Sequence, residues 1–148
     1  MKYILSLMIA VVCLTSANSQ VAVGNVPSRV INAFQSKYPH ASNVYWTGKV
    51  VHFSVNFNSG GENLTANYKD DGTWEQTYMG MPFNNLPSAI KNGFDRSKYK
   101  DWKVKEVRRI DARDKDRVYR IEVKKNTFQK KNLFFNVNGQ LTDDNITV

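Results

Sequence analysis

Two segments of the chain carry apolar residues at the spacing of an amphipathic helix. In the first, Val30, Phe34 and Tyr38 recur at every fourth position, which places them along one side of a helix. Ile90 and Phe94 show the same spacing in the second segment. A proline stands shortly before each segment, and proline suits a first helical turn because that position needs no N–H donor. The pattern therefore predicts two helices, each with one apolar side.

Apolar and polar residues alternate in the segments that follow each predicted helix. The alternation runs through residues 53–57 and 64–68 after the first helix, and through 119–123 and 132–136 after the second. A period of two is typical of antiparallel strands with one buried face and one open face. We therefore expect each helix to be followed by about four antiparallel strands.

One further region predicts a strand less directly. Its apolar residues Val104, Val107 and Ile110 are three positions apart, which fits either a bulged strand or a helix. The first half has Val44 and Trp46 at the corresponding place, ahead of its alternating segments. By comparison with these two residues, we expect a strand.

Two dipeptides, Asp71-Gly72 and Asn138-Gly139, are typical of hairpin turns. A two-residue loop would direct Trp74 to the polar face of the sheet. A three-residue loop with its glycine in the left-handed conformation keeps the apolar face apolar in both halves, so we predict this loop. The expected pairs are Tyr68 with Trp74 and Phe135 with Leu141.

The two halves of the chain resemble each other. Three segments of the first half recur in the same order in the second, at a separation of 60 to 67 residues. We therefore predict an α+β fold built as a tandem repeat of a helix plus about four antiparallel strands. Both helices would pack on one sheet face and leave the other face open. The matched segments are 26–34 with 86–94, 53–57 with 119–123, and 71–74 with 138–141.

The chain begins with the pattern of a secretory signal peptide. Lys2 precedes an apolar run over residues 4–14, and Ala17 and Ser19 lie where they favour cleavage before Gln20. The run is shorter than the roughly 20 residues of a spanning helix, so we expect no membrane span and a periplasmic or secreted protein. The expected regions are a signal peptide (1–19), a first repeat (20–85) and a second repeat (86–148), the two repeats forming one pseudo-symmetric domain.

The single cysteine, Cys13, falls within the predicted signal peptide. Val12 stands before it, where a lipoprotein signal has a small residue. The mature chain would therefore hold no disulfide, no thiol nucleophile and no thiolate metal ligand. Its stability has to come from the hydrophobic core, which a chain of this length is able to form.

Other candidates for chemistry are few. His40 and His52 are 12 residues apart, without the spacing of a helical metal site. Asp111, Asp114 and Asp116 alternate with cations and lack the glycine of a calcium loop, which favours a solvated turn. The chain has neither a Gly-x-Ser-x-Gly motif nor a phosphate-binding glycine loop. We therefore expect no catalytic residue, no metal and no cofactor, in a protein that is not an enzyme.

Charge is distributed unevenly between the two halves. Residues 20–81 contain four basic and four acidic side chains, whereas residues 82–148 contain 16 and nine. A positive field attracts anionic partners, so an alternative function is binding of an envelope polyanion, either lipopolysaccharide or an acidic protein, through the second repeat. Solvated strand faces account for the same charges. We expect no nucleic acid partner, because an exported protein meets little of it and Glu122 interrupts the basic face.

These motifs together resemble the PepSY-like family of exported Bacteroidetes proteins, whose fold is similar to that of the β-lactamase inhibitor protein. The resemblance covers nearly all of the mature chain. It implies a periplasmic location, two helix-plus-four-strand repeats, and a role in binding and inhibiting another protein such as a hydrolase. The sequence departs from the pattern in its second half, where Glu106 stands at the position of Trp46 and Leu141 at that of Trp74. The matching motifs are Pro-Ser-x-Val/Ile-x-x-Phe, Val44-x-Trp46, Phe53-x-Val55 and Asp-Gly-x-Trp.

The open sheet face is the predicted docking surface for an unidentified envelope or extracellular protein. Phe134 is the most suggestive residue, because a large apolar side chain on a polar face often marks a contact site. Burial at the junction between the two repeats would explain Phe134 equally well. The candidate binding residues are Tyr45, His52, Ser54, Asn56, Arg120, Glu122, Lys124 and Phe134.

Overall fold

The computed structural model describes residues 26–49 and 52–146. The predicted signal peptide, its cleavage site and Cys13 lie outside the described residues. The described chain forms two α-helices, one short 3₁₀-helix (η1) and eight β-strands. In chain order these are α1 (Ser28–Lys37), β1 (Ser42–Lys49), β2 (His52–Ser59), β3 (Glu62–Lys69), β4 (Trp74–Gly80), η1 (Phe83–Asn85), α2 (Ser88–Asp95), β5 (Lys103–Ala112), β6 (Val118–Lys124), β7 (Lys130–Asn136) and β8 (Leu141–Ile146).

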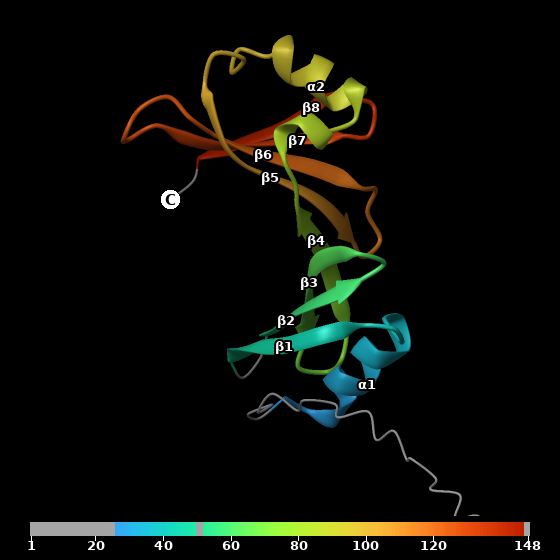
Figure 1. Cartoon of the computed structure of the whole chain (residues 1–148). Helices are drawn as coiled ribbons and strands as arrows, with labels where there is room; N and C mark the ends of the chain where they lie inside the picture. The colour runs from blue at the N-terminus through green and yellow to red at the C-terminus, as the bar shows by residue number, and fades with distance from the viewer. Residues whose placement is uncertain (1–25, 50–51, 147–148) are drawn as a thin grey trace, which may run out of the picture.

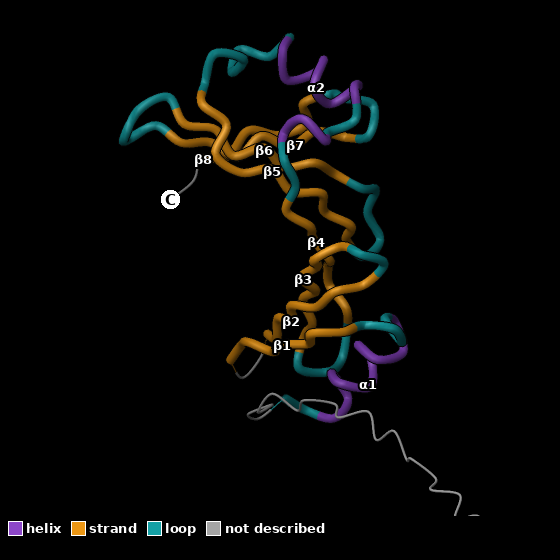
Figure 2. Tube along the Cα trace, viewed as in Figure 1, coloured by secondary structure: helices purple, strands orange, loops and turns teal. Residues whose placement is uncertain are grey.

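The eight strands form one antiparallel sheet in which each strand pairs with its neighbours in sequence, from β1 to β8. The predicted α+β class is therefore confirmed, and the sheet is continuous across both halves because Tyr78 of β4 pairs with Ile110 of β5. Figure 1 shows the sheet bending about β4, with α1 beyond the lower strands and α2 beyond the upper ones. Figure 2 shows the same order, with the strands between two separate helical segments. Among the described residues, no helix is long and apolar enough to cross a membrane.

Each helix packs its apolar side on the strands that follow it. Val30 and Phe34 of α1 are buried against a cluster from β2 and β3 that includes Phe57. Ile90 and Phe94 of α2 are buried against a cluster from β5, β6 and β7. Burying one such side chain contributes about 1.5–3 kcal/mol. The strand registers place both clusters on the same face of the sheet.

Both helices begin directly after a proline. The carbonyl of Pro27 accepts hydrogen bonds from the N–H groups of Val30 and Ile31, and that of Pro87 does the same for Ile90 and Lys91. These hydrogen bonds pair the proline carbonyl with the first helical N–H groups. The proline ring costs nothing at this position, because its missing N–H would have no partner within the helix.

The predicted turn register is confirmed in both halves. Tyr68 pairs with Trp74 and Phe135 pairs with Leu141, and the ladder shifts by one residue beside each pair. Gly72 has a φ of 90° within the first of these turns, a conformation that a residue with a Cβ rarely adopts. The bulges allow the apolar face to continue through the turn.

The strand predicted for the segment with Val104, Val107 and Ile110 is also confirmed. It is β5, and it contains a bulge between Val104 and Glu106. The strand pairing corrects one sequence correspondence. Trp46 pairs with Val55, and the residue that makes the equivalent pair in the second half, with Ile121, is Val107. Glu106 pairs with Glu122 and therefore corresponds to Tyr45, which pairs with Asn56, rather than to Trp46.

Candidate functional site

The face of the sheet away from α1 and α2, here called the open face, carries all eight candidate residues. They lie on β1, β2, β6 and β7 at alternate positions whose cross-strand partners share this face. Direct pairs within the set are Tyr45 with Asn56, and Arg120 with Phe134. The pairing shows that these residues share a surface, and their role in binding stays a prediction.

The first half of the open face is polar and internally hydrogen-bonded. The Ser54 hydroxyl donates to Asn67 Oδ1 over 2.9 Å, and the Thr65 hydroxyl donates to Asn56 Oδ1 over 2.7 Å. Tyr45, on the edge strand β1, is 52% exposed. Because neighbouring side chains already satisfy one another, this region offers ordered amide and hydroxyl groups at little entropic cost.

His52 lies at the margin of this region. Its Nδ1 is 3.4 Å from the carboxylate of Glu75 on β4, and the imidazole is largely exposed. A pair so open to solvent adds little stability. It suits the polar rim of an interface better than its centre.

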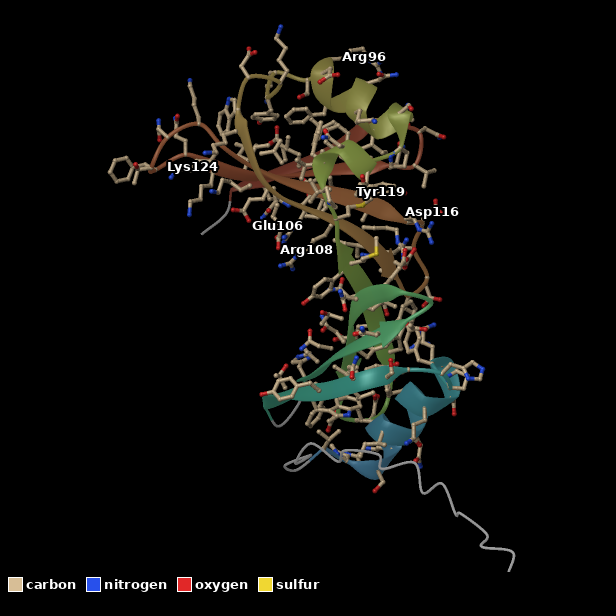
Figure 3. All side chains as sticks on the ribbon, viewed as in Figure 1. Arg96, Glu106, Arg108, Asp116, Tyr119 and Lys124 are labelled. Carbon is tan, nitrogen blue, oxygen red and sulfur yellow. The ribbon has the colours of Figure 1, made fainter. Side chains whose placement is uncertain are left out.

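The middle of the open face holds a connected set of charged and aromatic side chains, here called the central cluster: Tyr78, Glu106, Arg108 and Arg120. The Glu106 carboxylate accepts hydrogen bonds from both guanidinium groups, from Arg108 over 2.7 Å and from Arg120. The guanidinium of Arg108 stacks on the Tyr78 ring, 4.6 Å from its centroid. In Figure 3, Glu106 and Arg108 lie on the side of β5 away from α2.

The central cluster is partly desolvated and carries a net positive charge. The Arg120 side chain is only 19% exposed, and its Nε has no hydrogen-bond partner among the described residues. Two guanidinium groups share one carboxylate, so one positive charge is left over. Partial burial strengthens such electrostatic interactions relative to those of fully solvated charges.

Sequence reasoning found only Arg120 of this cluster. The sequence pattern does not indicate Tyr78, because this residue follows a second bulge, between Asn67 and Tyr68 on the paired strand. It does not indicate Glu106 and Arg108 either, because the spacing of apolar residues in β5 hides the alternation of its two faces. The signal that could have found them is Val107: once it is placed in the core, its neighbours Glu106 and Arg108 must face the other way.

The second half of the open face combines apolar and charged groups. Phe134 is half-buried between its cross-strand partners Arg120 and Asp143. Glu122 pairs with Asn132. Lys124 pairs with another lysine, Lys130, at the end of the strands. Phe134 therefore lies beside the central cluster within the second half.

Outside the open face, the Asp144 carboxylate is paired with neighbouring side chains of the fold. The Asp144 carboxylate accepts a hydrogen bond from the Tyr99 hydroxyl over 2.6 Å and pairs with Lys98 and Lys131 at 3.2 Å each. The Tyr99 hydrogen bond, followed by the two lysines, lowers the pKa of Asp144 to about 2. These contacts hold β8 against β7 and against the segment between α2 and β5.

Asp111 lies within β5, not in the predicted turn, and is likewise engaged by arginines. The Asp111 carboxylate accepts a hydrogen bond from Arg117 Nε over 2.6 Å and lies 3.5 Å from Arg109 Nε. Arg109 also pairs with Glu62 of β3 at 3.0 Å. Within residues 26–49 and 52–146, no three acidic, histidine or cysteine side chains gather as a metal site would require.

Solved structures from Bacteroides share this fold. A BLIP-like protein from Bacteroides fragilis superimposes with a TM-score of 0.75 at 23% identity, covering 84% of this chain and 89% of that one. A DUF2874 family protein from Bacteroides ovatus gives 0.75 at 23% identity, covering 82% and 88%. A protein from Bacteroides eggerthii, described as "putative periplasmic", gives 0.72 at 22% identity, covering 83% and 90%.

No protein of curated function matches the chain. The sequence profile of one family matches residues 51–143, and that family is described as "Putative beta-lactamase-inhibitor-like, PepSY-like". The matched segment runs from β2 to β8 and includes the central cluster, α2 and most of the open face. The chain belongs to this PepSY-like family.

Proposed function

We propose that this protein is a non-catalytic protein-binding module of the bacterial envelope, which docks a folded partner on its open face. The observation that carries the proposal is the central cluster: Tyr78, Arg108 and Arg120 are held in order around Glu106, in the middle of a face that neither described α-helix covers. The polar residues of β1–β3 and Phe134 would complete the contact area.

The chemistry of the cluster fits an interface centre. Tyrosine and arginine are, with tryptophan, the side chains most enriched at positions that dominate binding energy. Arg108 is stacked on Tyr78 and bonded to Glu106, so it loses little rotamer freedom when a partner arrives. A partner that offers a carboxylate or an aromatic ring would find Arg108 and Tyr78 already oriented.

The names of similar proteins support a periplasmic inhibitor. The family is described as resembling β-lactamase inhibitors, one structural neighbour is called BLIP-like and another periplasmic. The central cluster has one carboxylate between two guanidinium groups and no nucleophile, which suits recognition rather than acid–base catalysis. Inhibition of an envelope hydrolase is the specific activity that we infer.

A duplication gives the open face its extent. The segments proposed as repeats, 20–85 and 86–148, each contribute one helix and four strands. In each, the glycine of the last hairpin packs on the first turn of the helix, Gly72 against Arg29 and Gly139 against Ala89. Two such units, joined edge to edge through β4 and β5, make a sheet face wide enough for a folded partner.

A comparative pull-down tests this proposal. The immobilised protein, a Tyr78→Ala/Arg108→Ala variant and an Arg96→Ala control are each exposed to an envelope extract at low and high salt. Arg96 directly follows α2, on the side of the sheet that the helices cover (Figure 3). Its substitution therefore removes a charge without altering the open face. Thermal unfolding of the three proteins confirms that each is folded.

We expect one discrete protein to be retained at high salt by the wild type and the Arg96→Ala control, and to be lost from the double variant. Equal retention by all three would place the interface elsewhere and reject the proposal. If the captured partner is a hydrolase, its turnover should fall as the protein is added. Unchanged turnover at saturating protein would reject inhibition while leaving the binding function intact.

A further inference from the structure

Lysine side chains gather at one end of the second half in an arrangement that the fold itself does not favour. Lys103 of β5 pairs directly with Lys124 of β6, which pairs directly with Lys130 of β7. Like charges directly opposite one another destabilise a sheet. Lys105 and Lys125 lie beside this row and are exposed. Among the described side chains, none of these five lysines has an ion-pair partner.

Protection of sheet edges explains only part of the row. Lysines on an edge prevent edge-to-edge aggregation, and Lys103 lies in the part of β5 that extends beyond its pairing with β4. Lys124 has no such role, because β6 is paired there on both sides, with Lys103 and with Lys130. The other cations on strands β5 to β7 have acidic partners: Arg108 and Arg120 share Glu106, and Lys131 pairs with Asp144. On these strands, the described lysines without an ion-pair partner therefore lie together at the end of the sheet at the β6–β7 hairpin.

The tip of that hairpin presents an aromatic ring to solvent. Phe128 is 94% exposed. The tip is ordered, because Asn126 Oδ1 accepts hydrogen bonds from the N–H groups of Phe128 and Gln129 over 3.0 and 2.9 Å. The N–H of Lys125 also donates to the carbonyl of Gln129 over 2.9 Å. Figure 1 shows this hairpin, in orange, extending past the neighbouring strands and away from both helices.

We propose that the β6–β7 hairpin attaches the protein to an anionic lipid surface. Phe128 enters the layer between the headgroups and the acyl chains, and Lys103, Lys124, Lys125 and Lys130 contact lipid phosphates. An apolar tip surrounded by cations is the arrangement that binds at a membrane interface without spanning it. Each lysine near such a surface strengthens the partition coefficient about fivefold.

A lipid surface fits these residues better than other anions do. Several lysines on flexible stems contact many phosphates spread over a plane, whereas a single free phosphate would engage only one or two of them. Single-stranded nucleic acid needs several aromatic platforms along a groove, and the tip offers one ring. The proposed attachment is separate from docking on the open face, so either property can fail without the other.

Vesicle flotation tests the attachment. The exported protein is mixed with phosphatidylethanolamine vesicles that contain phosphatidylglycerol, or with neutral phosphatidylcholine vesicles. Two variants are compared with the wild type: Phe128→Ala, and a triple Lys103→Gln/Lys124→Gln/Lys130→Gln. A triple Lys100→Gln/Arg96→Gln/Lys115→Gln variant removes the same charge from exposed positions elsewhere.

We expect binding to the phosphatidylglycerol vesicles alone, weakened roughly tenfold by Phe128→Ala and about a hundredfold by loss of the hairpin lysines. The control triple variant should bind nearly as the wild type does. Equal losses in the two triple variants would show a non-specific charge effect and overturn the proposal. Tighter binding to a single-stranded oligonucleotide than to vesicles, or equal binding to neutral vesicles, would also overturn it, as would displacement from vesicles by glycerol phosphate.

Discussion

Gly139 lies directly against the backbone of Ala89, so close that a Cβ at residue 139 would overlap the Ala89 carbonyl oxygen. This contact joins the last hairpin of the sheet to the first turn of α2. The same relationship recurs in the first half, where a Cβ on Gly72 would lie 2.9 Å from the carbonyl oxygen of Arg29 in α1. Each helix is therefore held at a fixed height above the sheet by a turn that has no room for a side chain.

Alanine at Gly139 should destabilise the protein by about 2–4 kcal/mol, because the new methyl group meets backbone and the residue has a φ of 77°. Gly72→Ala should be less damaging, by about 1–3 kcal/mol, since its contact is looser. The matched control is Gly80→Ala, where a Cβ meets nothing within 4 Å. Chemical denaturation gives the three free energies of unfolding. Equal losses at Gly139 and Gly80 would contradict the packing described.

The register of both hairpins was predictable because two sequence signals agree there. The Asp-Gly and Asn-Gly dipeptides indicate turns, and only one loop length keeps Trp74 and Leu141 on the apolar side. The sequence pattern does not predict the contact between each turn and its helix. Gly72 and Gly139 meet two requirements: a positive φ, and the absence of a Cβ where the helix backbone approaches. Only the positive φ follows from the chemistry of the turn.

Removing the hydroxyl should have opposite effects on stability at two tyrosines of the apolar cluster beneath α1. The Tyr68 hydroxyl is buried with no hydrogen-bond partner among the described residues, and burial raises its pKa well above the usual value. Tyr68→Phe should therefore leave stability unchanged or raise it by about 1 kcal/mol. The Tyr38 hydroxyl is 2.6 Å from the Thr77 hydroxyl, so Tyr38→Phe should lower stability by about 1 kcal/mol. Urea denaturation compares the two, and a larger loss from Tyr68→Phe would reveal an unrecognised partner.

Tyr78, Glu106 and Arg108 of the central cluster could not be predicted from the sequence, and the reason is physical. Alternation identifies an exposed strand face only while the period of two is unbroken, and β5 contains a bulge between Val104 and Glu106. On β2, β6 and β7, where no bulge interrupts the pattern, alternation placed the candidate residues on the correct face. The stacking of Arg108 on Tyr78 depends on the pairing of β4 with β5. That pairing joins the two halves, and no local pattern predicts it.

Acid should weaken the anchoring of β8. The folded-state pKa of Asp144 is about 2, against 3.8 for an ordinary aspartate, because of the Tyr99 hydrogen bond and the two lysines. A lowered pKa contributes stability that is fully present above pH 3.8 and is lost as the pH falls towards 2. The unfolding free energy of the wild type should therefore drop more steeply over this range than that of Asp144→Asn. Tyr99→Phe, which removes the largest cause of the shift, should give an intermediate slope. Parallel pH profiles for the wild type and Asp144→Asn would contradict this assignment.

Phe134 separates a binding role from a structural one. Its side chain is half-buried beside Arg120, whereas the adjacent Phe135 is fully buried in the core beneath α2. Phe135→Ala should destabilise the protein by about 3–5 kcal/mol. Phe134→Ala should change stability by about 1 kcal/mol or less and weaken partner binding at least tenfold, because an apolar ring next to the central cluster is a favoured anchor. The fully exposed Phe128 provides the control, since Phe128→Ala should leave partner binding unchanged. Thermal unfolding and affinity measured on the captured partner distinguish the cases: a large stability loss from Phe134→Ala would assign the ring to packing, and unchanged affinity would remove it from the docking surface.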